Sequence, residues 1–219
     1  MPSNARDAIL AAIDSATDGV RDADPATSHG SLSRTYRRSV GEASVELVGL
    51  LEERLVDYGV DVHRLDSTEL THVLGELITR RRLQRIVLPG DFPDSLTGPL
   101  ESVRVPLDDV TAHALDAVDA AVTLCAVAVA ETGTIMLDGG VGQGERALTL
   151  VPDTHICIVN ASQIVWGIPE ATERLAPAVR AGAPITWVSG PSATSDIELV
   201  RVAGVHGPRN LIVLLVTDT

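Results

Sequence analysis

Three nearly continuous apolar segments constrain the fold of this chain more than any other feature of its sequence. They are AVTLCAVAVAETGTIML at residues 121–137, HICIVN at 155–160 and LIVLLV at 211–216. Runs of this kind are typical of strands buried on both faces in a parallel sheet that helices cover. The first run is too continuous for an amphipathic helix. We therefore expect it to form two β segments that are bent or separated near Glu131–Gly133.

Amphipathic patterns alternate with strand patterns along the rest of the chain. Apolar residues spaced by three and four predict helices over 5–16, 40–58 and 168–179, and from Ser67 to the basic run at 80–85. Further strands are predicted at 60–65, 84–90, 102–105 and 184–190, with another helix from about Leu107. This alternation predicts a single α/β domain with a parallel sheet. The 219 residues suffice for one sizeable core.

The first 33 residues differ in character from the rest. A short amphipathic helix is followed by the polar stretch at 17–33, which contains Gly and Pro without helical or strand periodicity and predicts a linker or mobile loop. We therefore expect residues 1–33 to precede a domain at 34–219. The N-terminal residues lack the apolar stretch of a signal peptide, and no apolar run approaches the length of a transmembrane helix. A cytoplasmic location is expected.

Charge and residue usage exclude several classes of function. The net charge of −13 disfavours binding to nucleic acid. All 17 basic residues are arginine, so Schiff-base chemistry and a Walker-type phosphate lysine are excluded. Cys125 and Cys157 both lie in apolar runs and are expected in the core, and two cysteines cannot ligate a cluster. The histidines show no metal-ligand spacing, so no metal is predicted. No recognisable motif for flavin, nicotinamide or a cluster is present, so no cofactor is predicted either.

A glycine-rich turn runs from Ala130 to Gly144. Its glycines, including Gly142 and Gly144, allow positive φ angles and close approach of a ligand to the backbone, although a tight hairpin explains them equally well. The spacing matches neither a dinucleotide fingerprint nor a P-loop. Glu131 interrupts an apolar strand at its C-terminal end, where ligands bind in open parallel sheets. It is a candidate acid, base or nucleophile, or a carboxylate exposed beyond the core.

Two other segments contain candidate anion-binding residues. GPSATSD follows a predicted strand, and its Ser192 and Thr194 suit an anion-binding turn or a helix cap. His206 and Arg209 precede the last strand and suit a carboxylate or phosphate, or form an ordinary structural pair. Arg34 and Tyr36 belong to a local basic and aromatic cluster that either faces an anionic ligand or is a solvated surface.

Several motifs together closely resemble the lactate-utilisation protein C family, whose shared module is the LUD domain. The motifs are AETGT (130–134), GQGERALTLVPD (142–153), HICIV (155–159) with Gln163–Ile164 after it, GPSATSDIE (190–198) and GVHGPR (204–209). The similarity extends from about Arg34 to the end of the chain. It implies the fold shared by sugar-phosphate isomerases, CoA transferases and formyltetrahydrofolate cyclo-ligase-like proteins, in which helices sandwich a mixed sheet.

The resemblance also implies a role in bacterial oxidation of L-lactate to pyruvate. The family member acts there with two iron–sulfur partner proteins and carries no cluster itself. On this view Glu131, Arg146, His206 and Arg209 line a small anion pocket, suited to a small carboxylate, or an interface with the partners. The alternative is a stand-alone enzyme acting on an anionic acyl or sugar-phosphate-like substrate, with Glu131 as base or nucleophile and Arg209 as anion clamp. Sensing of lactate by the same pocket is a third hypothesis.

Overall fold

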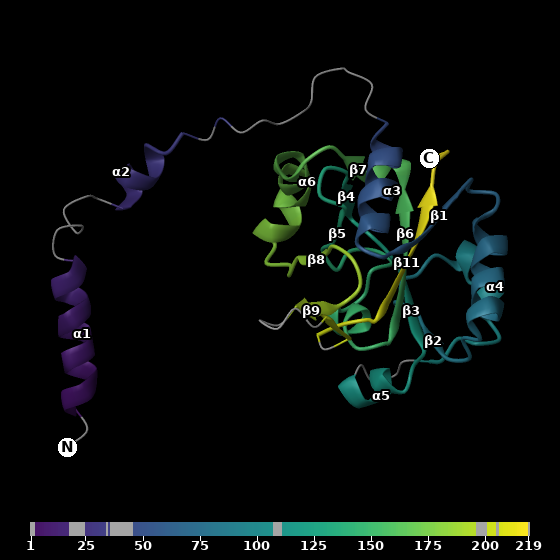
Figure 1. Ribbon diagram of the computed structural model, residues 1–219, viewed down its shortest axis with the longest axis horizontal. Coiled ribbons are helices and arrows are strands. Elements are labelled where there is room, and N and C mark those ends of the chain that lie inside the picture. Colours follow the sequence, from purple (N-terminus) through teal and green to yellow (C-terminus); the bar gives the residue numbers. More distant parts are fainter. Residues whose placement is uncertain are drawn as a thin grey trace. The chain divides into compact units, whose positions relative to one another are not determined.

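The computed structural model describes residues 3–17, 25–33, 35, 46–106, 111–195, 201–204 and 206–218. The chain divides into two compact units, residues 1–36 and 37–219. The first contains α1 (Ser3–Thr17) and α2 (Pro25–Gly30), both visible in Figure 1. Helix α2 lies inside the stretch predicted to be a linker or loop. Its Pro25 occupies the first helical position, where a missing N–H costs nothing.

The second unit is built on a five-stranded sheet in which every neighbouring pair of strands is parallel. In order across the sheet, the strands are β1 (Asp61–Leu65), β11 (Asn210–Val216), β6 (Thr154–Asn160), β3 (Ala120–Leu124) and β2 (Ile86–Val87). The central strand β6 and its neighbour β11 contain the apolar runs at 155–160 and 211–216. Both are buried along almost their whole length, as the sequence predicts.

A second, four-stranded sheet is mixed. Its strands, in order, are β7 (Ile164–Val165), β4 (Val127–Val129), β5 (Thr134–Leu137) and β8 (Thr186–Val188). Only the β4–β7 pair is parallel. The apolar run at 121–137 therefore forms three strands rather than two. The predicted break near Glu131–Gly133 separates β4 from β5, and a second break at Cys125–Ala126 moves the chain from one sheet to the other.

Side chains from alternate positions of β6 face opposite layers of the core. Ile156 and Ile158 pack in the cluster under α4 (Leu70–Arg81), whereas Cys157 and Val159 pack with α3 (Leu47–Asp57) and the second sheet. Helix α6 (Ile168–Arg180) covers the other face of that second sheet through Ala171 and Leu175. The layers are therefore α4, the parallel sheet, the mixed sheet with α3, and α6 (Figure 1).

Short elements complete the second unit. They are α5 (Ala112–Asp116), the antiparallel pair β9 (Ala193–Ser195) and β10 (Arg201–Ala203), and the 3₁₀ helices η1 (Asp94–Leu96), η2 (Gly98–Leu100), η3 (Arg146–Thr149) and η4 (Ala161–Gln163). The strand predicted at 102–105 forms only one isolated bridge, between Arg104 and Ile86. Residues 40–45 and 107–110, where helices are predicted to begin, lie outside the described ranges. No helix in the described part of the chain has the length and apolarity needed to cross a bilayer.

The observed architecture confirms the predicted α/β class with a mostly parallel sheet covered by helices. The division of the strands between two packed sheets is not predicted by the sequence. Strands β3 and β4 are both apolar at nearly every position, because each is buried on both faces of its own sheet. Hydrophobic pattern alone therefore does not reveal where the chain passes between them.

Candidate functional site

The glycine-rich loop between β5 and η3 is held together by one buried side chain. Gln143, which is 5% exposed, accepts a hydrogen bond from the Asp138 amide at 2.8 Å and donates one to Asp138 Oδ1 at 2.9 Å. The same carboxylate oxygen accepts a hydrogen bond from the Gly140 amide at 3.0 Å. Because these polar groups satisfy one another, the loop has a defined conformation without a ligand.

Gly142 and Gly144 have structural reasons to be glycine. Their φ angles are 70° and 68°, in the left-handed region. A Cβ atom on Gly142 would lie 2.7 Å from Leu124 Cδ1, and one on Gly144 would collide with Leu148. The Gly142 amide donates to Asp91 Oδ1 at 3.1 Å. These contacts match the hairpin explanation of the glycines, and the Gly142 amide already has a partner.

A cavity of about 510 Å³, hereafter the loop cavity, lies beside this loop. Its lining includes Arg146, whose side chain is exposed, together with Asp138 and Glu145. Thr149 and Thr186 form part of its wall and also part of the wall of a second cavity. The candidate residue Arg146 therefore borders a mixed-charge hollow that adjoins a smaller one.

The smaller cavity, hereafter the His155 cavity, has a volume of about 150 Å³. Its walls come from residues 149–150, His155, 186–192, 206–208 and Leu211. Four of the motifs that resemble the lactate-utilisation protein C family thus meet at one place, although they are up to about sixty positions apart in the sequence. Among the described residues that line it, none is acidic.

His155 is the buried polar group of this cavity. It lies on β6, is 1% exposed, and its Nε2 atom is 2.8 Å from the hydroxyl of Thr123 on the adjacent strand β3. Burial lowers the pKa of His155 from its ordinary value of 6.5 to about 4, so the ring is neutral near pH 7. In the part of the chain that the structure describes, the imidazole has no other hydrogen bond, which leaves Nδ1 for a molecule in the cavity.

Two of the predicted site residues, Ser192 and His206, come together at the same cavity. Ser192 Oγ accepts a hydrogen bond from the His206 amide at 3.2 Å, and the Ser192 amide donates to the Pro208 carbonyl at 2.8 Å. These bonds tie the GPSATSD segment to the GVHGPR segment. The backbone of Thr194 lies in β9 opposite Val202, and its side chain is outside the described residues.

The remaining candidates lie elsewhere. Arg209 forms an ion pair with Asp153, with Nη1 3.0 Å from Oδ1, and does not line the His155 cavity. Glu131 is exposed in the turn between β4 and β5, and its Oε2 lies 3.4 Å from where a Cβ on Gly167 would stand, at the start of α6. The described cavity linings do not bring Glu131, Arg146 and Arg209 together.

The location of Glu131 also corrects the expectation that it lies at the ligand-binding edge of an open parallel sheet. Its strand, β4, belongs to the mixed sheet and not to the parallel one, so the rule for open parallel sheets does not apply to it. The other two candidates, Arg34 and Tyr36, lie outside the described residues.

The AETGT motif has a hydroxyl connection to the His155 cavity. Thr132 Oγ1 is 2.8 Å from Thr134 Oγ1, which is 2.8 Å from Ser189 Oγ, and Ser189 lines the cavity. Gly133 has a φ of 60°, and a Cβ there would lie 2.8 Å from Cβ of Arg54 on α3. The motif therefore has a packing role and also supports one wall of the cavity.

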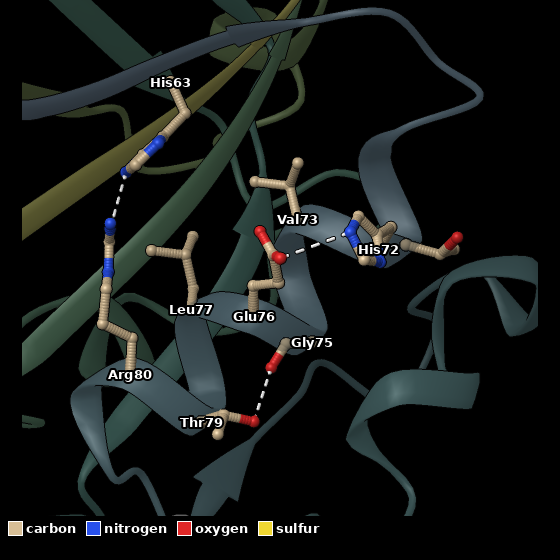
Figure 2. Close-up of a pocket in the computed structure, with 9 residues that line it drawn as sticks. His63, His72, Val73, Gly75, Glu76, Leu77, Thr79 and Arg80 are labelled. Carbon is tan, nitrogen blue, oxygen red and sulfur yellow. Dashed lines mark hydrogen bonds and ion pairs between the residues drawn. The ribbon is translucent and has the colours of Figure 1, made fainter.

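A larger hollow of about 730 Å³, hereafter the α4 cavity, lies between α4 and strand β1 and contains none of the predicted site residues (Figure 2). Its polar side chains contact one another. Figure 2 shows His72 directed at Glu76, with Nε2 and Oε1 3.3 Å apart, and Arg80 directed at His63, with Nη2 and Nε2 3.4 Å apart. The α4 cavity is thus a surface depression with mutually paired polar groups.

His155 was not predicted as a site residue from the sequence, where it is only one of the histidines without metal-ligand spacing. The available signal is a single histidine at the start of an otherwise apolar strand, the same kind of interruption that drew attention to Glu131. Within the described ranges no three His, Cys, Asp or Glu side chains gather as a metal site would need, and both cysteines are buried free thiols.

Comparison with known proteins places these features in a family. The family model described as "LUD domain" matches residues 48–216, which include the whole His155 cavity. Lactate utilization protein C of Deinococcus radiodurans is 46% identical over 173 residues, covering 78% of this chain and 80% of that protein. Lactate utilization protein C of Bacillus subtilis is 28% identical over 201 residues, covering 84% of this chain and 83% of that protein.

A solved structure shows the same fold. The crystal structure of a DUF162 family protein from Deinococcus radiodurans superimposes with a TM-score of 0.68 at 37% sequence identity. It covers 78% of this chain and 96% of that one. The resemblance drawn from the sequence motifs is confirmed by these matches.

Proposed function

Because the chain belongs to the LUD domain family, we propose that it is a cluster-free component of a bacterial iron–sulfur system that oxidises L-lactate to pyruvate. The observation that carries this proposal is the 46% identity to a protein named lactate utilization protein C, over most of both chains. The matched region extends from the first turn of α3 to the end of β11. We also place this system in the cytoplasm, where free thiols such as those of Cys125 and Cys157 persist.

The chemistry of the reaction supports a division of labour between proteins. Oxidation of lactate to pyruvate removes two electrons and two protons, so an electron acceptor is required. Iron–sulfur clusters are held by four ligands that are mostly cysteine thiolates. This chain has two cysteines, and Cys125 and Cys157 are both buried in the core. Its residues therefore do not fit a cluster, which supports an electron acceptor located on another protein.

The placement of the candidate residues favours this role over a stand-alone enzyme. That alternative needs Glu131 and Arg209 at one substrate. Instead, Glu131 lies against Gly167 at the start of α6, and Arg209 pairs with Asp153 before β6. Neither residue lines the His155 cavity, where the family motifs meet.

Isolation from cells grown on lactate tests the proposal directly. The tagged chain is purified from a bacterium that encodes it, grown on L-lactate as sole carbon source, and the eluate is analysed for iron, acid-labile sulfide and co-purifying proteins. We expect iron–sulfur proteins in the eluate and loss of growth on L-lactate after deletion of the gene, with unchanged growth on glucose. Recovery of the chain alone, together with normal growth of the deletion strain on L-lactate, would refute the proposal.

A further inference from the structure

The volume of the His155 cavity restricts what it can hold. A cavity of about 150 Å³ holds a molecule the size of benzene, which has six non-hydrogen atoms. Sites for drug-sized ligands and cofactors start at about 300 Å³. Nucleotides, flavins and acyl-CoA are therefore too large for this cavity by itself, whereas a three-carbon acid, also with six non-hydrogen atoms, fits.

The polar groups of the cavity suit a carboxylate. A Thr123 hydroxyl that donates to Nε2 of His155 leaves a hydrogen on Nδ1, and this N–H then becomes a donor at the cavity wall. Ser192 Oγ accepts from the His206 amide, so its own hydrogen is free to donate. The Thr186 hydroxyl has no partner among the described residues. A carboxylate accepts several hydrogen bonds and donates none, which complements such a set of donors.

The charge around the cavity points the same way. The chain has a net charge of −13, but no acidic side chain of the described part lines this cavity. The carboxylate of Asp153, in the loop just before His155, accepts hydrogen bonds from Arg209 Nη1 at 3.0 Å and from the side-chain amide of Asn210 at 3.1 Å. An anion in the cavity is therefore shielded from the repulsion that most of the surface would exert. Leu150 and Leu211 provide an apolar wall for a methyl group.

From this combination we propose that the His155 cavity binds a small monocarboxylate, with the carboxylate hydrogen-bonded by His155 and Ser192. The choice of a three-carbon 2-hydroxy or 2-oxo acid as the physiological ligand rests on the proposed function. The presence of the site does not, since it follows from the cavity itself. The site would hold the substrate or product acid of the oxidation on the cluster-free component.

The test is ligand-induced stabilisation of the purified full-length chain, measured as Tm against concentrations of L-lactate, pyruvate, inorganic phosphate and sodium chloride. A ligand that binds only the native state raises Tm in a saturable manner. We expect saturation with pyruvate or L-lactate and not with chloride. Equal or stronger saturation with phosphate would overturn the assignment to a carboxylate, and the absence of saturation with either acid would overturn the site.

Two variants locate the bound acid. In Gly207→Ala the added methyl would lie 3.4 Å from Ser192 Cβ and 4.0 Å from Leu150 Cδ2, so it narrows the cavity at ordinary contact distances. We expect at least tenfold weaker binding with little change in the Tm of the free protein. Gly98→Ala is the matched control, because a Cβ there meets nothing within 4 Å. Unchanged affinity in Gly207→Ala would contradict the proposed location.

His155→Gln removes the imidazole donor, and we expect about tenfold weaker binding, the loss of one hydrogen bond to a charged group. His72→Gln, in the α4 cavity of Figure 2, is its control and should bind as the natural chain does. If His155→Gln fails to fold, ¹⁵N NMR of the natural chain replaces it. The Nδ1 resonance of His155 should shift on addition of pyruvate, and an unchanged resonance at saturation would overturn the role of His155.

These outcomes separate the site from the proposed function. Binding of pyruvate or lactate at the cavity, with normal growth of the deletion strain on L-lactate, would support the site and refute the function. Loss of growth and recovery of iron–sulfur partners, without any acid binding, would support the proposed function and refute the site.

Discussion

The buried imidazole of His155 makes the stability of this protein depend on pH in a calculable way. Burial lowers the pKa of His155 from 6.5 to about 4 in the native state. Between these values the unfolded chain binds a proton at this residue and the native chain does not. Stability therefore falls as the pH is lowered through this window and rises as the pH increases. The full difference is about 3 kcal/mol, since each pKa unit corresponds to about 1.4 kcal/mol.

At pH 5 about 2 kcal/mol of this destabilisation is present, and near pH 7 almost none. Urea unfolding followed by circular dichroism at pH 7 and pH 5, for the natural chain and for His155→Gln, measures it. The natural chain should lose about 2 kcal/mol more than the variant on this change of pH. Protonation of carboxylates changes the free energy of unfolding equally in both proteins, so it cancels when the natural chain is compared with the variant.

His113→Gln is the control, because His113 is exposed on α5 and is not part of the cavity. Its pH dependence should match that of the natural chain. If His155→Gln shows the same loss of stability as the natural chain between pH 7 and pH 5, the imidazole is not buried as a neutral group, and the description of the cavity fails with it.

Two further predictions concern the glycine-rich loop and the surface. Gly142→Ala should lower the free energy of unfolding by about 1–3 kcal/mol, because its φ is 70° and the methyl would meet Leu124 at 2.7 Å, and urea unfolding should show no such loss for Gly98→Ala. Equal stability of these two variants would contradict the tight packing of the loop. Arg209→Gln should cost less than about 1 kcal/mol in the same assay, because its pair with Asp153 is solvent-exposed. It should also weaken pyruvate binding by less than Gly207→Ala does, because Arg209 neutralises Asp153 but does not line the cavity. A loss of binding as large as that of Gly207→Ala would show that Arg209 contacts the bound acid.

The buried strands of the parallel sheet could be predicted from the sequence for a clear reason. In β6 and β11 almost every residue faces other protein atoms, so residues 156–159 and 211–216 are all apolar, unlike those of a surface element. The transfer of the chain between sheets at Cys125–Ala126 could not be predicted, because the residues on both sides of it are equally buried. The hydrophobic pattern identifies which segments are buried. The topology of the sheets can be assigned only when the pairing partner of each strand is known.

The candidate site also contains residues that could be predicted from the sequence and residues that could not. Ser192 and His206 could be proposed from small polar residues placed beside predicted strands, and the fold brings both to one cavity. The only sequence signal for His155 is that it interrupts an apolar strand. Its significance depends on Thr123, more than thirty positions earlier, and on the adjacency of β3 and β6. Glu131 drew attention as a polar residue that interrupts the apolar run at 121–137, but the strands on either side of it, β4 and β5, belong to the mixed sheet.

Consumption of L-lactate by a deletion strain complemented with variants of this chain tests the central claim most directly. The claim is that the protein is a required component of lactate oxidation and acts through the His155 cavity. The natural chain and Gly98→Ala should both restore consumption, and Gly207→Ala, present at the same level in the cell, should not. Normal lactate consumption by the uncomplemented deletion strain would contradict the account.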